Sequence, residues 1–281
     1  MPATTAGRVH EALAAATDAF AAAGVDTPRL DAEVLLGEAT GRDRASLAAD
    51  PEASVDPPAA RRFGEMVRRR VRREPVAYIL GRKGFRNIEL AVDPRVLIPR
   101  PESELLVDIA LELEPATVLD VGTGSGAIAL AVADELPGCD IVATDTSDDA
   151  LALARENAAR LGSADRVTFE LGTVPTGRRF DLVLANLPYV REDELATLQP
   201  EIRDYEPRQA VVAGAEGIEA IAVVAAAATA ALTEHGALAF EVGAGQAGSV
   251  AELLVDLGFT QVEGRQDLAA IPRVVLGRMG A

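Results

Sequence analysis

Two short stretches of this 281-residue chain hold residue types and spacings that can do chemistry. The first is the glycine-rich run GTGSG at 122–126, which follows the apolar residues 117–121. Glycines let a backbone pass close to a ligand, and a helix starting there offers free N–H groups. The second is Asn-Leu-Pro-Tyr at 186–189, after the apolar run 180–185. Because each follows a predicted strand, both are expected at the carboxyl edge of one sheet, where open α/β sheets bind ligands.

The carboxylate of Asp145 supports the interpretation of the glycine run as part of a nucleotide-binding site. It ends the predicted strand 140–144 and stands 19 positions after Gly126. A carboxylate in that place can accept hydrogen bonds from both hydroxyls of a ribose. The nearby Ser147 is better placed to cap the helix that follows. These features favour a cofactor that carries adenosine, either a nicotinamide dinucleotide or S-adenosylmethionine. Ala127 disfavours the dinucleotide, because the pattern G-x-G-x-x-G requires glycine there.

The residues at 186–189 suit methyl transfer to a carboxamide or to an exocyclic aromatic amine. Such a group carries two N–H donors and a conjugated lone pair. The side-chain carbonyl of Asn186 and the main-chain carbonyl of Leu187 can accept the two hydrogens. Pro188 restricts the turn and aims the Leu187 carbonyl, and Tyr189 provides an aromatic plate. This arrangement favours S-adenosylmethionine as the cofactor, with catalysis by positioning and by the arrangement of charge.

Composition excludes several other classes of function. The chain has 27 basic and 44 acidic residues, a net charge of −17, which disfavours general binding to phosphate backbones. Cys139 is the only cysteine, so no intrachain disulfide can form and a reducing compartment is expected. The two histidines, His10 and His235, have no neighbouring ligand residues, so no metal site is expected. The N-terminus shows no signal-peptide pattern, and the apolar run 220–232 is too short to span a bilayer.

Apolar spacing predicts a helical N-terminal part over residues 5–73. Its third helix, at about 59–73, is rich in arginine. That helix is interpreted as a solvated face or, alternatively, as a docking surface for an acidic partner. Residues 76–97 predict a short hairpin with its turn at Asp93-Pro94. Ser103 is a candidate cap for a helix that runs to about Leu113.

From residue 117 the pattern alternates between strand and helix. Strands are predicted at 117–121, 140–144, 167–171, 180–185, 236–242, 260–265 and 273–278, and helices at 126–135, 149–161, 218–233 and 248–257. This alternation indicates a mostly parallel sheet covered on both faces. Only 266–272 separate the last two strands, which predicts a hairpin and one antiparallel strand at the end of the sheet.

The predicted fold is therefore α/β. It is a Rossmann-like, seven-stranded, mostly parallel sheet with a C-terminal antiparallel strand, plus a small N-terminal helical domain and a linking β-hairpin. The expected limits are 1–74 for the helical, substrate-docking domain, 75–98 for the linker with the hairpin, and 99–281 for the methyltransferase domain.

Nearly the whole chain resembles the class I S-adenosylmethionine-dependent methyltransferases, and within them the HemK family, which methylates glutamine in peptide chain release factors. The segments that carry the resemblance are 30–36, 74–81, 97–104, 205–210, 241–246 and 267–274. The resemblance implies a cytoplasmic enzyme, expected as a monomer, whose protein partner is a release factor with its target glutamine in a Gly-Gly-Gln loop. It implies that the target amide is held by Asn186, Leu187, Pro188 and Tyr189. The implied cofactor contacts are Gly122, Thr123, Gly124, Ser125, Gly126, Asp145, Thr173 and Asn186.

Two positions depart from the pattern of that family. Leu187 replaces the first proline of the usual Asn-Pro-Pro-Tyr, and Thr173 stands where an acidic residue commonly follows the third strand. Asn-Leu-Pro-Tyr also resembles the signature of ribosomal RNA adenine dimethyltransferases. The alternatives are therefore an N6-adenine methyltransferase acting on RNA or DNA, and a paralogue that methylates glutamine in another protein. A non-catalytic module that docks a translation factor is a further class.

Overall fold

The computed structural model describes residues 7–280, which form two compact units. One unit runs to Gly81 and also contains the distant segment Gln199–Tyr205. The other comprises Arg82–Leu198 and the chain from Glu206 onward. The domain limits expected at 74 and 98 remain predictions. The segment between them contributes helix α5 (Val76–Leu80) to the first unit and a hairpin to the second.

The first unit is helical because its apolar residues recur at helical spacing. Its other helices are α1 (Val9–Ala22), α2 (Pro28–Thr40), α3 (Arg44–Ala49), α4 (Pro57–Val71) and α9 (Pro200–Tyr205). On α1 the buried side chains are Val9, Leu13, Ala16 and Phe20, which form one stripe. The sequence pattern missed α3, because this helix has six residues and buries only Leu47, too few to show a period.

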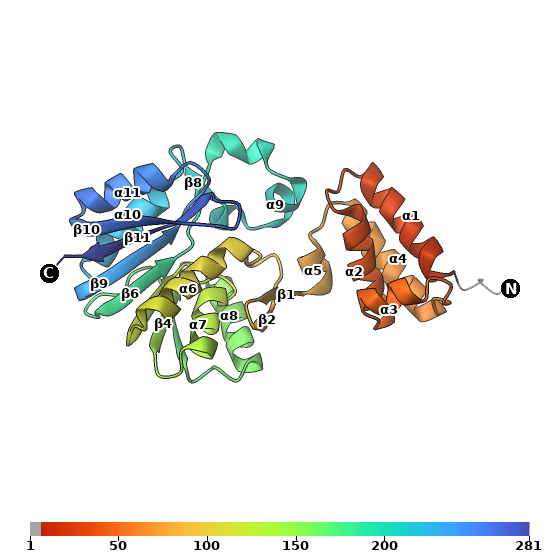
Figure 1. The fold of residues 1–281 in the computed structure, drawn as a ribbon, viewed down its shortest axis with the longest axis horizontal. Coiled ribbons are helices and arrows are strands. Elements are labelled where there is room, and N and C mark those ends of the chain that lie inside the picture. Colours follow the sequence, from red (N-terminus) through yellow and green to blue (C-terminus); the bar gives the residue numbers. More distant parts are fainter. Residues whose placement is uncertain (1–6, 281) are drawn as a thin grey trace. The chain divides into compact units, whose positions relative to one another are not determined.

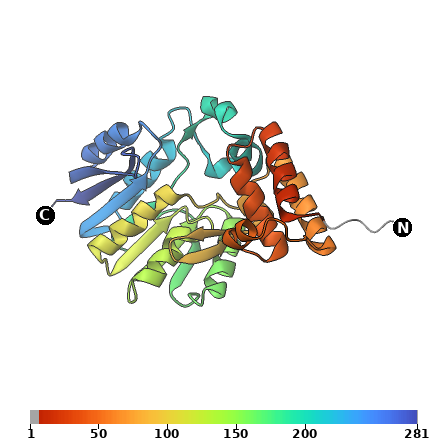
Figure 2. The same ribbon diagram turned by 45° about the vertical axis from the view of Figure 1, so that its right-hand side comes forward.

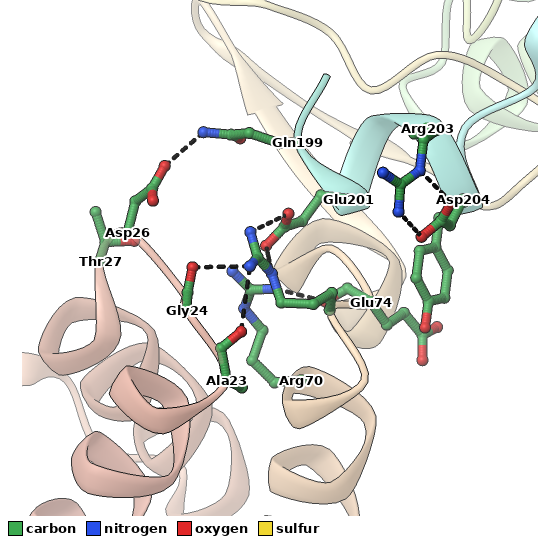
Figure 3. A network of polar contacts seen from close by, with 12 residues as sticks. Ala23, Gly24, Asp26, Thr27, Arg70, Glu74, Gln199, Glu201, Arg203 and Asp204 are labelled. Atoms are coloured by element: carbon green, nitrogen blue, oxygen red, sulfur yellow. Dashed lines mark hydrogen bonds and ion pairs between the residues drawn. The ribbon is translucent and has the colours of Figure 1, made fainter. Parts of the chain in front are cut away.

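The segment 199–205 is held in the first unit by charged contacts, although it lies far along the chain. The carboxylate of Glu201 receives Arg70 at 2.7 Å and Arg73 at 2.6 Å. Arg73 also donates to the backbone carbonyl of Gly24 at 2.7 Å, and these contacts are drawn in Figure 3. Tyr205 donates its hydroxyl to a backbone carbonyl of the same unit, that of Arg72, at 2.7 Å. Figure 2 shows this segment, in teal, beside the red helices.

Most of the arginines of α4 form ion pairs or hydrogen bonds within the first unit. Arg70 is 5% exposed and pairs with Asp31 at 2.7 Å as well as with Glu201. Arg69 pairs with Glu74 at 2.6 Å, and Arg62 donates to a backbone carbonyl of α2. The expected solvated face is therefore wrong for Arg70, which holds the helices and the distant segment together.

The second unit is built on a seven-stranded sheet with the order β10-β11-β9-β6-β3-β4-β5. Its strands are β3 (Thr117–Val121), β4 (Asp140–Asp145), β5 (Val167–Leu171), β6 (Phe180–Ala185), β9 (Leu232–Glu241), β10 (Phe259–Gln266) and β11 (Pro272–Met279). Pairing is parallel from β9 to β5, and β11 is antiparallel to both of its neighbours. The predicted fold class is confirmed. One detail was wrong: β11 lies between β9 and β10, because it pairs on both sides, so the antiparallel strand is not at the edge.

Helices cover both faces of this sheet. One face carries α6 (Glu104–Leu113), α7 (Ala127–Glu135) and α8 (Asp148–Arg160), and the other α10 (Glu219–Thr229) and α11 (Ala247–Asp256) (Figure 1). Alternate residues of a strand point to opposite faces. On β3, accordingly, Val118 packs in the first layer, and Leu119 and Val121 in the second. Short elements lie at Pro101–Ser103, Val190–Arg191 (β7), Glu192–Thr197, Arg208–Ala210 and Val212–Gly214 (β8).

The hairpin of the second unit lies earlier in the chain than expected. It is formed by β1 (Arg82–Phe85) and β2 (Ile88–Ala91), with Arg86-Asn87 at the turn. Arg86 has a φ of 48°, a left-handed conformation that a tight turn requires and that its sequence does not signal. The Asp93-Pro94 turn expected from the sequence is a separate one, closed by a hydrogen bond from the N–H of Val96 to the carbonyl oxygen of Asp93 at 3.1 Å. Across residues 7–280, no helix combines the length and the apolar character needed to cross a bilayer.

Candidate active site

The glycine turn lies at the carboxyl end of β3. Gly122, Gly124 and Gly126 have φ values of 77°, 55° and 84°, a backbone path that side chains disfavour. The N–H groups of Gly122 and Thr123 donate to the carbonyl of Thr144 on β4 at 2.8 and 2.9 Å. These bonds fasten the turn to the neighbouring strand, and the next N–H group, that of Gly124, donates to the side chain of Asp145.

The turn packs directly on the second stretch that the sequence singled out. A β-carbon added at Gly122 would lie 3.1 Å from Cδ2 of Leu187 and 3.5 Å from the carbonyl oxygen of Asn186. Leu187 is 7% exposed and belongs to the core that covers the sheet on the α10 side. The leucine found here in place of the family's proline therefore seats residues 186–189 against the glycine turn.

A cavity of about 480 Å³ opens at this edge of the sheet, which lies within the usual range of about 300–1,000 Å³ for small-molecule sites. Its lining brings together most of the predicted site residues: Gly122, Thr123, Gly124, Ser125, Asp145, Thr173, Asn186, Leu187 and Pro188. Among the described residues, two predicted ones lie outside the lining. Gly126 is the N-cap of α7 and packs against Leu130, and Tyr189 is half-buried with its ring beside Gly243.

Asp145 is oriented by two backbone groups. Its Oδ2 accepts from the N–H of Gly124 at 2.9 Å, and its Oδ1 accepts from the N–H of Ser147 at 2.9 Å. The hydroxyl of Ser147 caps α8 by accepting from Ala150 at 3.2 Å, as the sequence indicated. Asp145 is thus free of the capping role and presents its carboxylate to the cavity.

A second carboxyl group, Asp120, lies beneath the turn. Its Oδ2 accepts from the hydroxyl of Thr123 at 2.6 Å and from the N–H of Ala129 at 3.2 Å. Its Oδ1 is buried and has no hydrogen-bond partner among the described residues. Burial raises the pKa of Asp120 to about 7, against the opposing effect of the Thr123 hydrogen bond.

Asn186 is tied to a buried network at the side of the cavity. Its Nδ2 donates to Oγ of Ser103 at 2.9 Å, and that hydroxyl donates to Oε2 of Glu241 at 2.5 Å. The hydroxyl of Tyr189 lies 3.5 Å from the other oxygen, Oε1 of Glu241. Burial raises the pKa of Tyr189 to about 12, with a smaller contribution from the charge of Glu241. Glu241 is therefore linked to Asn186 through Ser103, and it also lies next to the hydroxyl of Tyr189 at the other end of the Asn-Leu-Pro-Tyr stretch.

Ser103 and Glu241 are residues whose part in the site sequence reasoning missed. Ser103 was expected to cap α6, but its side chain makes no capping bond and points into the network instead. Glu241 ends the apolar strand β9 at the same sheet edge as the glycine turn. A carboxylate at the end of a buried strand is a signal that could have found it. Gln246 was also missed as a support: its Nε2 donates to the carbonyl of Tyr189 at 2.8 Å.

The described residues hold no cluster of three or more His, Cys, Asp or Glu side chains arranged to bind a metal ion.

Comparison with solved structures agrees with the architecture. The catalytic domain of hMettl16, solved in complex with the MAT2A 3'UTR hairpin 6, is 14% identical with a TM-score of 0.60, covering 73% of this chain and 82% of its own. A methyltransferase from Pyrococcus furiosus is 17% identical with a TM-score of 0.52, covering 68% and 89%. A family model described as "Methyltransferase domain" matches residues 114–225. The second unit thus has the Rossmann-like fold of class I methyltransferases.

The family within that class follows from sequence relatives. A model described as "PrmC N-terminal domain" matches residues 11–81. The release factor glutamine methyltransferase of Geobacter sulfurreducens is 41% identical over 92% of each chain. That of Cereibacter sphaeroides is 41% identical over 98% of this chain and 99% of its own. The chain belongs to the family of release factor glutamine methyltransferases.

Proposed function

We propose that the protein transfers a methyl group from S-adenosylmethionine to the side-chain amide nitrogen of a glutamine in a peptide chain release factor, the glutamine of its Gly-Gly-Gln loop. The observation that carries the proposal is that the glycine turn and Asn186 line one cavity. The names of the relatives in Geobacter sulfurreducens and Cereibacter sphaeroides support the substrate. Since release factors act on ribosomes, a cytoplasmic location is part of the same proposal, and we propose a monomer.

The residues of the cavity fit the cofactor. Gly124 has open space around a notional β-carbon, so a ligand can approach the backbone there. Asp145 offers a fixed carboxylate that can accept both ribose hydroxyls. Thr173 lines the same cavity and would contact the cofactor. When bound, S-adenosylmethionine supplies an electrophilic methyl group on a positively charged sulfur.

The chain's own part is to hold the glutamine amide. In the proposed site Oδ1 of Asn186 and the carbonyl of Leu187 accept the two amide hydrogens. The substitution of leucine for proline at 187 keeps that carbonyl, and Pro188 still restrains the residue before it. The ring of Tyr189 lies outside the cavity lining, so its role as a plate for the amide plane stays a prediction. These contacts fix the nitrogen and leave one face of its conjugated lone pair open to the methyl group. One of the two N–H protons leaves after the transfer, so the site works by positioning.

Incubation with labelled S-adenosylmethionine and a purified release factor tests the proposal. We expect label on the wild-type factor and none on a matched factor whose Gly-Gly-Gln glutamine is replaced by alanine. Asn186→Ala should lower kcat by about 100-fold or more, as loss of a preorganised polar contact does. Most of its affinity for the cofactor should remain, because the contacts at the ribose and the glycine turn are kept. Cofactor binding without transfer to the factor would contradict the proposal.

An adenine amine presents the same two N–H donors, so nucleic acid is the natural competitor. Binding it calls for a basic face. The arginines of α4 that would supply one include Arg69 and Arg70, which are paired within their own unit. We therefore favour the protein substrate. Label transferred to ribosomal RNA and not to the release factor would reverse this choice.

A further inference from the structure

The direction in which the Asn186 amide faces is decided by hydrogen bonds. The oxygen and nitrogen of an asparagine side chain have nearly the same shape, so its contacts alone select one of two orientations. Only one orientation suits a substrate amide. The carbonyl oxygen must face the cavity, because a substrate N–H needs an acceptor. The orientation of Asn186 is consequently a condition for the proposed reaction.

Ser103 selects that orientation because a hydroxyl has a single hydrogen. The hydroxyl donates this hydrogen to Glu241 at 2.5 Å, so its oxygen can offer only lone pairs to Asn186. Asn186 must then turn its –NH2 toward Ser103, as the 2.9 Å contact from Nδ2 records. The carbonyl oxygen of Asn186 is left on the other side. Ser103 and Glu241 are 3% and 2% exposed, so water does not offer competing partners.

We propose that Ser103 and Glu241 are positioning residues for the methyl transfer: Glu241 takes the hydroxyl hydrogen of Ser103, and Ser103 thereby fixes the Asn186 amide with its oxygen toward the substrate. This inference rests on the proposed role of Asn186 as the acceptor for the glutamine amide. Glu241 does not line the cavity; Ser103 does, and its hydroxyl is engaged by Glu241 and Asn186. Both act through Asn186, and Glu241 also meets the hydroxyl of Tyr189.

All hydrogen bonds of this network are donated in one direction, from Asn186 to Ser103 and from Ser103 to Glu241, and protonation of Glu241 would reverse that direction. A protonated Glu241 would donate a hydrogen bond to the Ser103 oxygen. The Ser103 hydroxyl could then donate its own hydrogen bond to the oxygen of Asn186, and the amide would turn its –NH2 toward the cavity.

The pKa of Glu241 is raised to about 7 by burial, with the charge of Glu102 acting the same way. The Ser103 hydrogen bond, Arg273 and the Tyr189 hydroxyl oppose that rise. Arg273 is itself paired with Asp267 at 2.9 Å. Ionisation of Glu241 therefore falls where a kinetic pH profile can follow it.

Kinetics of four variants test the inference with the full-length protein and a release factor. Glu241→Gln keeps the shape but replaces a group that only accepts with an amide that can turn an N–H toward Ser103, so kcat should fall by about tenfold or more with little change in cofactor affinity. The wild-type rise in kcat through about pH 7 should be absent in this variant. Ser103→Ala should lose kcat similarly, and Ser103→Thr, which keeps the hydroxyl, should restore it. Glu252→Gln, an exposed carboxylate on α11, is the matched control and should behave as wild type.

A second measurement does not depend on methyl transfer. In ¹⁵N-labelled protein the side-chain –NH2 resonance of Asn186, identified by its loss in Asn186→Ala, should titrate with a midpoint near 7. In Glu241→Gln it should not titrate. A wild type that shows this titration but methylates no release factor would remove the proposed function and keep only the coupling of Glu241 to the orientation of the Asn186 amide. An active wild type without the titration, or Glu241→Gln with wild-type kcat and pH profile, would overturn the inference alone.

Discussion

The carboxylate of Asp145 accepts a hydrogen bond from the backbone N–H of Gly124 at 2.9 Å, which fastens the end of β4 to the turn that follows β3. Its second oxygen is held by the N–H of Ser147, also at 2.9 Å. A carboxylate has about four acceptor sites, so these two bonds orient Asp145 and still leave it able to accept ligand hydroxyls. The acid is thus preorganised at the rim of the glycine turn.

Replacing Asp145 by alanine should weaken cofactor binding more than it changes the fold. Charge-assisted hydrogen bonds contribute about 1.5–3 kcal/mol, so the Kd for S-adenosylmethionine should rise by about 10- to 100-fold. Isothermal titration calorimetry measures this directly. Asp149→Asn is the control, since Asp149 is exposed on the next helix and does not line the cavity. Equal affinity in wild type and Asp145→Ala would mean that the cofactor ribose lies elsewhere.

Gly122→Ala should harm both stability and cofactor binding. The residue has a φ of 77°, and its new β-carbon would lie 3.1 Å from Cδ2 of Leu187. A left-handed alanine costs about 1–2 kcal/mol, and the steric contact adds displacement of residues 186–189. Gly138→Ala separates the two effects, because Gly138 has a φ of 105° and nothing within 4 Å of its notional β-carbon. Both variants should unfold earlier in urea, but only Gly122→Ala should lose about tenfold or more in cofactor affinity. Equal cofactor affinity in both would refute the close packing.

The sequence predicted what depends on local pattern. The strand and helix alternation after residue 117, and the placement of the two reactive stretches at strand ends, follow from apolar runs punctuated by glycine and proline. The hairpin turn was misplaced, because Asp93-Pro94 is a stronger local turn signal than Arg86-Asn87. Arg86 is left-handed there, and its side chain pairs with Asp108 and Glu135, contacts that no local pattern signals. Pairings between distant residues, such as Ser103 with Glu241, leave no period in the sequence, so they could not be predicted.

The buried carboxyl of Asp120 should make stability fall as pH rises. Its pKa is raised from 3.8 to about 7, so the folded state holds the proton more tightly than the unfolded chain. Stability is therefore greatest below the lower value, decreases through this window and stays at its lowest above about 7. Asp120→Asn removes this ionisation. We expect the variant to gain stability relative to wild type by an amount on the order of a few kcal/mol between pH 4 and pH 8.

Chemical denaturation at several pH values, without cofactor, measures that difference. The buried –NH2 of the asparagine lowers the stability of the variant by an amount that does not vary with pH, so the slope and not the absolute value is diagnostic. Parallel pH dependences for the two proteins would show that Asp120 does not titrate in this window.

The ion pairs of Glu201 should control the local stability of residues 199–205. Removing one member of a buried pair costs about 3–5 kcal/mol. Glu201→Gln should lie at the lower end, because Arg70 keeps its 2.7 Å contact with Asp31. Amide exchange of peptides covering 199–205, followed by mass spectrometry, should then accelerate by about 100-fold. Glu65→Gln is the control. It breaks only an exposed pair with Arg68 on α4, so amide exchange of residues 199–205 in this variant should match wild type. If residues 199–205 stayed equally protected in Glu201→Gln, apolar packing and the hydroxyl of Tyr205 would have to hold this segment in the helical unit without the charge cluster.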